Sequence, residues 1–139
     1  MTASQIKLVQ ESFPSIAEQG GAIAMLFYGR LFQMQPQLRP MFRQDIQLQG
    51  QKLMDMLTTL TGSLDRFAAL TPILRALGQR HAGYGVRDEH YTAVSTALLW
   101  AFGTALEGEF SRELKSAWSA VIDAVSEVMK AGAAEVKVL

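Results

Sequence analysis

Apolar residues recur at intervals of three and four along almost the whole chain, and this spacing constrains the fold more than any other feature. It predicts helices, because residues three and four apart share one face of a helix. The first helix is expected to begin at a capping box made by Thr2 and Gln5 and to be bent or started late by Pro14. Alternating apolar and polar runs, which would indicate strands, are nearly absent. The sequence therefore predicts an all-α fold.

Capping residues, prolines and glycines predict where the later helices begin and end. The expected helices are one over 21–35 ended by Pro36, one over 48–64, one opened by Thr71 and Pro72 and ended near His81, one capped by Asp88, and a last one opened by Ser111. We therefore expect six or seven helices in total.

Charge balance and the absence of cysteine exclude several classes of protein. The 139 residues carry 13 basic and 13 acidic side chains, so no net charge favours nucleic acid or an acidic membrane surface. Without cysteine there can be no disulfide, thiolate metal site, iron–sulfur cluster, thiol nucleophile or covalent haem attachment. No stretch approaches the ~18 to 20 apolar residues of a membrane span, and the N-terminus lacks the pattern of a signal peptide. We expect one cytoplasmic domain over 1–139, with neither nucleic acid nor membrane as partner.

Only two histidines are present, so any histidine chemistry depends on His81 or His90. The motifs of hydrolases, kinases and zinc proteases are missing, which disfavours those enzymes. His90 lies in the charged segment RDEHY and is expected at the surface. His81 lies four residues after Leu77 at the end of an amphipathic helix, so its ring is expected on the apolar side. A histidine in that position is, by itself, more often a hydrogen-bonded core residue than a metal ligand.

A set of residues running from the second helix to His81 resembles the globin family in order and spacing. The set is Tyr28, Pro36, Phe42, Gln49, Leu53 and His81. Tyr28 and Pro36 lie eight apart, and Pro36 and Phe42 six apart, as in globins. The segment LFYGRLFQMQPQLRPMF resembles the bacterial branch that includes flavohaemoglobins and their single-domain relatives, and LGQRHAGYGV resembles the proximal-histidine segment of that branch. The resemblance covers nearly the whole chain and implies a globin fold packed around haem b.

The resemblance also implies a role for each residue of the set. His81 would be the proximal ligand of the haem iron, and Phe42 would stack on the porphyrin edge. Tyr28 and Gln49 would donate hydrogen bonds to a bound gas, with Leu53 closing the distal side. Further haem contacts would come from Lys52 and Arg80 at the propionates and from Leu57, Leu77, Val86, Tyr91, Val94 and Leu98 along the walls. For the two basic residues simple solvation is the alternative, and the apolar residues would belong to the core in either case.

One segment departs from the family pattern. Between Phe42 and the start of the distal helix the chain is about three residues shorter than typical flavohaemoglobin-like sequences. The distal position is therefore assigned by counting back 32 residues from His81, which selects Gln49 over Lys52. We expect a short corner before the distal helix.

On the proximal side, Tyr91 and Glu135 lie where flavohaemoglobin-like proteins have a tyrosine and a glutamate that hydrogen bond with the proximal histidine. Such a partner would increase electron density on the iron and favour activation of oxygen over simple binding. A solvated glutamate near the end of the last helix is the alternative for Glu135.

The resemblance implies two functions, and a third hypothesis does not depend on it. The expected function is reversible binding of oxygen, CO or nitric oxide for storage, transport or sensing. The alternative is an enzyme, a nitric oxide dioxygenase that would need a separate reductase because the chain carries no flavin or nicotinamide fingerprint. The third is a helical interaction module whose methionine- and leucine-rich groove binds a partner helix without haem. A Soret band separates the first two hypotheses from the third.

Overall fold

The computed structural model describes residues 1–42 and 45–137, and these ranges are helical without strands. The α-helices are α1 (Ala3–Glu18), α2 (Gly20–Met34), α3 (Ile46–Gly62), α4 (Phe67–Gly83), α5 (Asp88–Leu106) and α6 (Arg112–Lys137). Short 3₁₀ turns cover Pro36–Met41, Leu64–Arg66 and Glu107–Glu109. The predicted all-α fold is confirmed, with six α-helices in the described ranges.

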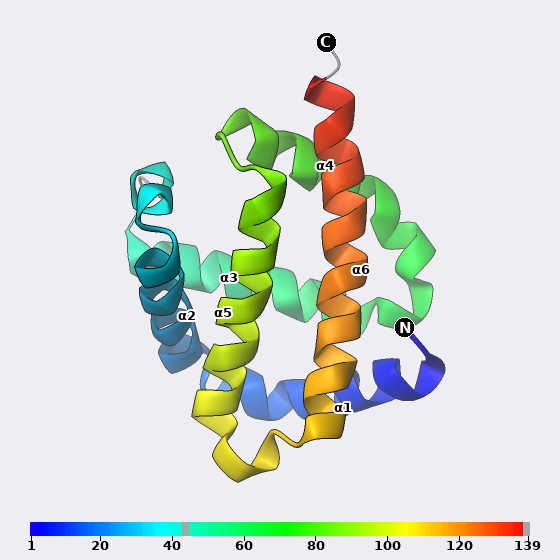
Figure 1. Cartoon of the computed structure of the whole chain (residues 1–139). Helices are drawn as coiled ribbons and strands as arrows, with labels where there is room; N and C mark the ends of the chain where they lie inside the picture. Colours follow the sequence, from blue (N-terminus) through cyan, green and yellow to red (C-terminus); the bar gives the residue numbers. More distant parts are fainter. Residues whose placement is uncertain (43–44, 138–139) are drawn as a thin grey trace.

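The helices cross one another around a shared core (Figure 1). α5 and α6 run antiparallel in front, α3 passes behind α5, and α4 crosses behind the C-terminal half of α6 (Figure 1). α6 packs on α4, α1 and α5, while α2 packs on α5 and α3. None of the helices in the described ranges has the length and apolar character needed to cross a membrane.

Two helix starts agree with the local capping signals. The Thr2 hydroxyl accepts from the Gln5 N–H at 3.1 Å, and the Gln5 side chain accepts from the Thr2 N–H at 2.8 Å. At the start of α6, the Ser111 hydroxyl accepts from the Leu114 N–H at 3.1 Å. Pro14 lies inside α1, which starts at Ala3 and is not delayed by the proline. Both capping predictions are therefore confirmed. Such caps can be predicted from the sequence because a capping residue and its partner lie within one turn of each other.

The predicted start of α4 at Thr71 and Pro72 is wrong. The helix begins at Phe67, directly after the 3₁₀ turn, and the Thr71 hydroxyl contacts the Phe67 carbonyl at 3.4 Å from inside the helix. The earlier start brings Leu70 into the core, where it is buried. Burial of apolar side chains therefore outweighs the single backbone hydrogen bond that Pro72 cannot make.

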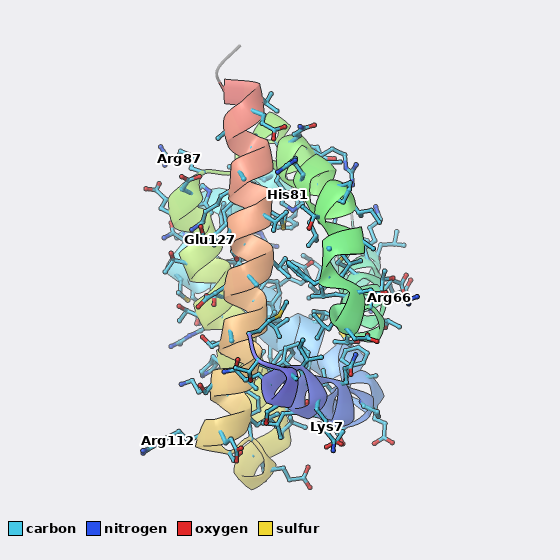
Figure 2. All side chains as sticks on the ribbon, turned by 90° about the vertical axis from the view of Figure 1, so that its right-hand side faces the viewer. Lys7, Arg66, His81, Arg87, Arg112 and Glu127 are labelled. Atoms are coloured by element: carbon cyan, nitrogen blue, oxygen red, sulfur yellow. The ribbon has the colours of Figure 1, made fainter. Side chains whose placement is uncertain are left out.

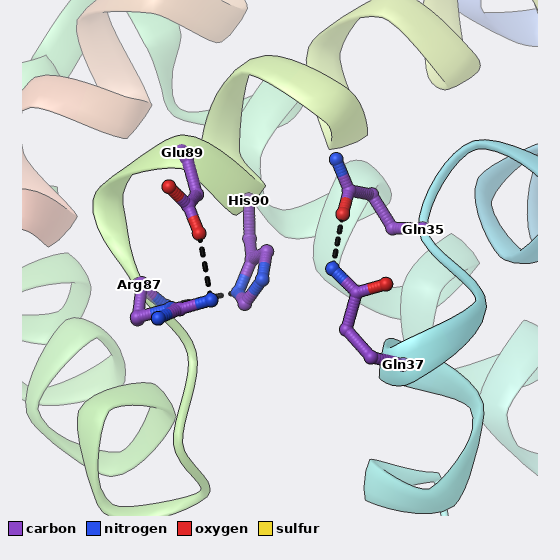
Figure 3. Close-up of polar contacts among 5 residues, drawn as sticks. All are labelled: Gln35, Gln37, Arg87, Glu89 and His90. Atoms are coloured by element: carbon purple, nitrogen blue, oxygen red, sulfur yellow. Dashed lines mark hydrogen bonds and ion pairs between the residues drawn. The ribbon is translucent and has the colours of Figure 1, made fainter.

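The expectation of a surface position for His90 is also wrong, since only 1% of this residue is exposed. Its Nδ1 accepts the Arg87 backbone N–H at 3.0 Å (Figure 3). The predicted cap at Asp88 is wrong, because α5 begins at Asp88 and Arg87 is the N-cap residue. Its neighbours Arg87 and Glu89 are exposed, and the Arg87 guanidinium lies 2.8 Å from the Glu89 carboxylate (Figure 3). Charged residues beside a histidine in sequence did not indicate exposure, because adjacent residues of a helix point in different directions.

Trp118 of α6 is fully buried and organises the core between α1, α5 and α6. Its ring centroid lies 4.8 Å from that of Phe102, at an interplanar angle of 60°, and 6.4 Å from that of Phe13. The indole N–H donates to the Ser12 hydroxyl of α1 at 2.9 Å. This bond ties the first helix to the last.

Replacing Ser12 with alanine should lower the free energy of unfolding by ~1 to 3 kcal/mol, because the buried Trp118 N–H would lose its acceptor. Urea unfolding followed by tryptophan fluorescence measures the change. Ser15→Ala, at an exposed site of the same helix, is the matched control and should change stability by less than about 0.5 kcal/mol. Equal stability of the two variants would contradict this role for the Ser12 hydroxyl.

Candidate functional site

Tyr28 of α2 presents a buried hydroxyl group to the backbone of α3. The residue is 6% exposed, and its hydroxyl donates to the Gln49 carbonyl oxygen at 3.3 Å. This distance is long beside the ~2.7 to 2.8 Å typical of O–H···O bonds, so the bond is weak. Burial raises the pKa of Tyr28 to about 12. The group is therefore a protonated donor at neutral pH, with a hydrogen that is only loosely held.

A close crossing of α2 and α3 brings Tyr28 to this position. A Cβ atom placed on Gly50 would lie 2.9 Å from the Ala24 Cβ, so the helices can approach this closely only with glycine there. Gly50 follows Gln49, whose carbonyl accepts from Tyr28. The Gln49 side chain is half-buried and that of Lys52 is exposed. This difference supports the choice of Gln49 over Lys52 as the distal residue, which stays a prediction.

Phe42 joins Tyr28 through aromatic contacts and is half-buried. Its ring centroid lies 5.4 Å from that of Tyr28, edge to face at 68°, and 5.4 Å from that of Phe32 at 62°. Edge-to-face packing of this kind is favourable. Phe42 is therefore anchored beside Tyr28. The predicted short corner includes residues 43–44, which lie outside the described residues.

His81 of α4 is oriented by its own helix. Its Nδ1 lies 2.8 Å from the Leu77 carbonyl oxygen, and a carbonyl only accepts, so Nδ1 carries the hydrogen. Burial lowers the pKa of His81, the Leu77 carbonyl partly opposes this shift, and the charge of Arg80 adds to it. The ring is therefore neutral at pH 7, with the lone pair on Nε2. A neutral imidazole in this tautomer is a good metal ligand.

Several of the predicted apolar haem contacts are only half covered by protein. They are Leu53 of α3, Leu77 of α4, Val86 in the following turn and Val94 of α5. Their neighbours one turn away on the same helices, Leu57, Leu74 and Leu98, are buried. Of the other predicted haem contacts, Lys52 and Arg80 are exposed and Tyr91 is buried. A flat apolar group with polar edges would suit this distribution.

The donor set limits how a metal could be held. Within the described ranges, no three or more histidine, cysteine, aspartate or glutamate residues lie together as a metal site. One histidine cannot hold a metal ion alone, so a metal at His81 would need a cofactor that brings its own ligands. A porphyrin would bring four nitrogens of its own, so that one protein nitrogen would be enough to hold its iron. The residues present therefore fit a haem.

Tyr91 and Glu135 are not joined as predicted. The Glu135 carboxylate lies 3.2 Å from the Arg75 Nε and accepts from the Gln79 side chain at 3.0 Å, and both partners belong to α4. Tyr91 is 8% exposed, and its hydroxyl has no hydrogen-bond partner among the described residues. Burial raises its pKa, and Asp88 adds to this effect. Sequence spacing could not show which residues of α4 face the last helix.

Sequence reasoning missed several residues beside the site. Phe32 lies four residues after Tyr28 and so shares its face of α2, which the spacing could have revealed. Arg75 and Gln79 are also four residues apart and share one face of α4. Nothing in the sequence indicated that this face would meet Glu135.

Comparisons with known proteins agree with this arrangement. The family model for globins matches residues 26–129. A flavohemoprotein of Xylella fastidiosa is 30% identical over 128 residues, which cover 90% of this chain and 32% of that protein. A flavohemoprotein of Vibrio cholerae is 24% identical over 131 residues, covering 92% of this chain and 33% of that protein. The chain thus spans about a third of the length of the curated relatives it matches.

Solved structures match over the full length of the fold. An engineered carbene transferase made from a candidate nitric oxide dioxygenase of Rhodothermus marinus superposes with a TM-score of 0.89 and 26% identity, over 99% of this chain and 96% of that chain. A bacterial globin from Campylobacter jejuni gives a TM-score of 0.86 at 20% identity, over 99% and 100%. The second likeness shows the fold alone. Together with the match of the family over residues 26–129, these findings show that the chain belongs to the globin family.

Proposed function

We propose that residues 1–139 form one haem domain that binds haem b through His81 and binds diatomic gases on the side of Tyr28 and Gln49. The observation that carries this proposal is the Nδ1 contact of His81 with the Leu77 carbonyl at 2.8 Å, which leaves the Nε2 lone pair for a metal. Haem binding by relatives supports it, since a flavohemoglobin of Malassezia yamatoensis, similar in fold, was solved with bound FAD and haem.

When bound, haem supplies an iron that takes one protein nitrogen and one small ligand. His81 contributes that nitrogen, and the Leu77 carbonyl keeps its ring in one orientation and tautomer. Leu53 and Phe42 exclude water from the distal side. Lys52 and Arg80 are exposed and would contact the propionates at the edge.

The Tyr28 hydroxyl has a single hydrogen to donate, and the weak 3.3 Å bond to the Gln49 carbonyl makes that hydrogen easy to redirect. A gas ligand that gains negative charge on binding, such as oxygen, is a better acceptor than a neutral carbonyl. We therefore propose that Tyr28 donates to the outer atom of bound oxygen, with the Gln49 amide as a second donor. CO gains little charge and should benefit far less.

Nitric oxide dioxygenation is a second candidate, favoured by the 26% identical neighbour that was engineered from a candidate enzyme of this kind. The overall reaction converts oxygen, nitric oxide and one electron into nitrate. The electron has to come from a reductase. The relatives named as flavohemoproteins support such a partner. Reversible gas binding remains the primary proposal, because it requires only the residues described.

The test is a haem titration followed by gas kinetics. Adding haemin to the purified protein should produce a Soret band that saturates at one haem per chain, and CO should shift the band of the reduced form. Absence of a Soret band would reject both haem functions and favour the helical interaction module. Repeated additions of nitric oxide to the oxygenated protein in the presence of a reductant then separate the candidates, since formation of more than one nitrate per haem supports the enzyme.

A further inference from the structure

The helix that carries His81 meets the last helix at backbone contact distance. A Cβ atom placed on Gly78 of α4 would lie 2.0 Å from the Met129 carbonyl oxygen of α6. Reciprocally, a Cβ atom on Gly132 of α6 would lie 2.1 Å from the Arg75 carbonyl oxygen of α4. Figure 2 shows α4 converging on α6 at the end that carries His81 and moving away toward Arg66. We call these two glycines the glycine crossing.

Glu135 makes a second contact between the same two helices. It lies three residues after Gly132 on α6, and it binds Arg75 and Gln79, which flank Gly78 on α4. Arg75 and Glu135 are each about half exposed, and a pair of that kind contributes little energy. Because one carboxylate contacts two points on α4, the two contacts together favour one rotation of this helix about its own axis.

The glycine crossing adjoins the group that orients His81. Leu77, whose carbonyl binds His81 Nδ1 at 2.8 Å, immediately precedes Gly78. Because α4 is a continuous helix from Phe67 to Gly83, a displacement at Gly78 moves the Leu77 carbonyl and the imidazole ring together. The depth of this crossing thus determines how far Nε2 reaches into the site.

We propose that the glycine crossing and the Glu135 contact together set the position of His81 Nε2 relative to the haem iron. Gly78, Gly132 and Glu135 are then positioning residues, and Glu135 acts on His81 through α4 instead of through Tyr91. This inference rests on the proposed haem binding. It adds that residues outside the pocket determine the position of His81.

The test compares Gly78→Ala and Gly132→Ala with Gly83→Ala in the haem-loaded protein. Gly83 is the matched control, because it lies on α4 and an added Cβ would meet no described atom within 4 Å. Resonance Raman of the reduced, unliganded protein reads the iron–histidine stretch, and transfer of haem to an excess of a scavenging apoglobin gives the dissociation rate. Alanine at either crossing position should shift or broaden the stretch and speed haem loss by at least about tenfold. Gly83→Ala should leave both readouts at wild-type values.

The Glu135 contact is tested with surface variants that keep the core intact. Glu135→Gln and Arg75→Gln should each shift the iron–histidine stretch, and the double variant should change it no further, because both residues belong to one contact. Tyr91→Phe should not reproduce the shift. If Tyr91→Phe matches Glu135→Gln while Arg75→Gln has no effect, Glu135 acts through the tyrosine and the proposal is overturned.

These outcomes separate the inference from the proposed function. Wild-type protein that binds no haem would reject both. Wild-type protein that binds haem and gas normally, with unshifted stretches in the crossing variants, would reject the inference alone. Should the crossing variants fail to fold by circular dichroism, the Glu135 and Arg75 variants still decide the proposal.

Discussion

His81→Ala is expected to lose haem rapidly. The substitution removes the proposed protein ligand of the iron, which leaves haem held by apolar packing and edge contacts alone. Loss of a residue that only hydrogen bonds to a metal ligand already weakens metal binding by ~10- to 100-fold. Loss of the ligand itself should therefore speed haem transfer to a scavenging apoglobin by more than about 100-fold. Haem transfer is measured as the decay of the Soret band.

Added imidazole provides the control that separates ligation from folding. In His81→Gly, free imidazole should occupy the space of the lost ring, bind the iron and restore much of the Soret intensity. Wild-type haem retention in His81→Ala would show that the ligand is misassigned. His90 would then be the residue to test, since it is the other histidine of the sequence.

Tyr28→Phe is expected to speed oxygen release by about ten- to a hundredfold. A hydrogen bond to a charged acceptor contributes ~1.5 to 3 kcal/mol, and each ~1.4 kcal/mol is a factor of ten. Little of this gain is offset by the bond lost in the resting protein, because the 3.3 Å contact with the Gln49 carbonyl is weak. Stopped-flow displacement of oxygen by CO measures the rate. CO release should change far less, because CO carries little charge on its outer atom.

Three controls test the proposed hydrogen bond from Tyr28 to oxygen. Gln49→Leu should act in the same direction but more weakly, and the double variant should show coupling, because both donors address one ligand. Since burial raises the pKa of Tyr28 to about 12, the wild-type rate should stay constant from neutral pH to about pH 10. An oxygen release rate within about twofold of wild type in Tyr28→Phe would contradict the donor role.

Many, though not all, features that depend on neighbouring residues could be predicted from the sequence. Apolar spacing indicated the helices, and the capping residues Thr2 and Ser111 marked two starts correctly, because a helix and its cap are determined within one turn. The ordered set from Tyr28 to His81 identified the globin family before the fold was known, and the match over residues 26–129 confirms it. The predicted position of His81 at the end of an amphipathic helix also agrees with its contact to Leu77.

Features that depend on how helices meet were decided only by the tertiary structure. Local signals favoured a surface site for His90, and the family resemblance implied a partnership of Glu135 with Tyr91. In the structure His90 is buried and Glu135 binds α4. The glycine crossing of α4 and α6 was equally invisible, since Gly78 and Gly132 lie 54 positions apart in the sequence. The physical reason is that periodicity shows which residues of one helix share a face, whereas the crossing of two helices decides which faces touch and how closely.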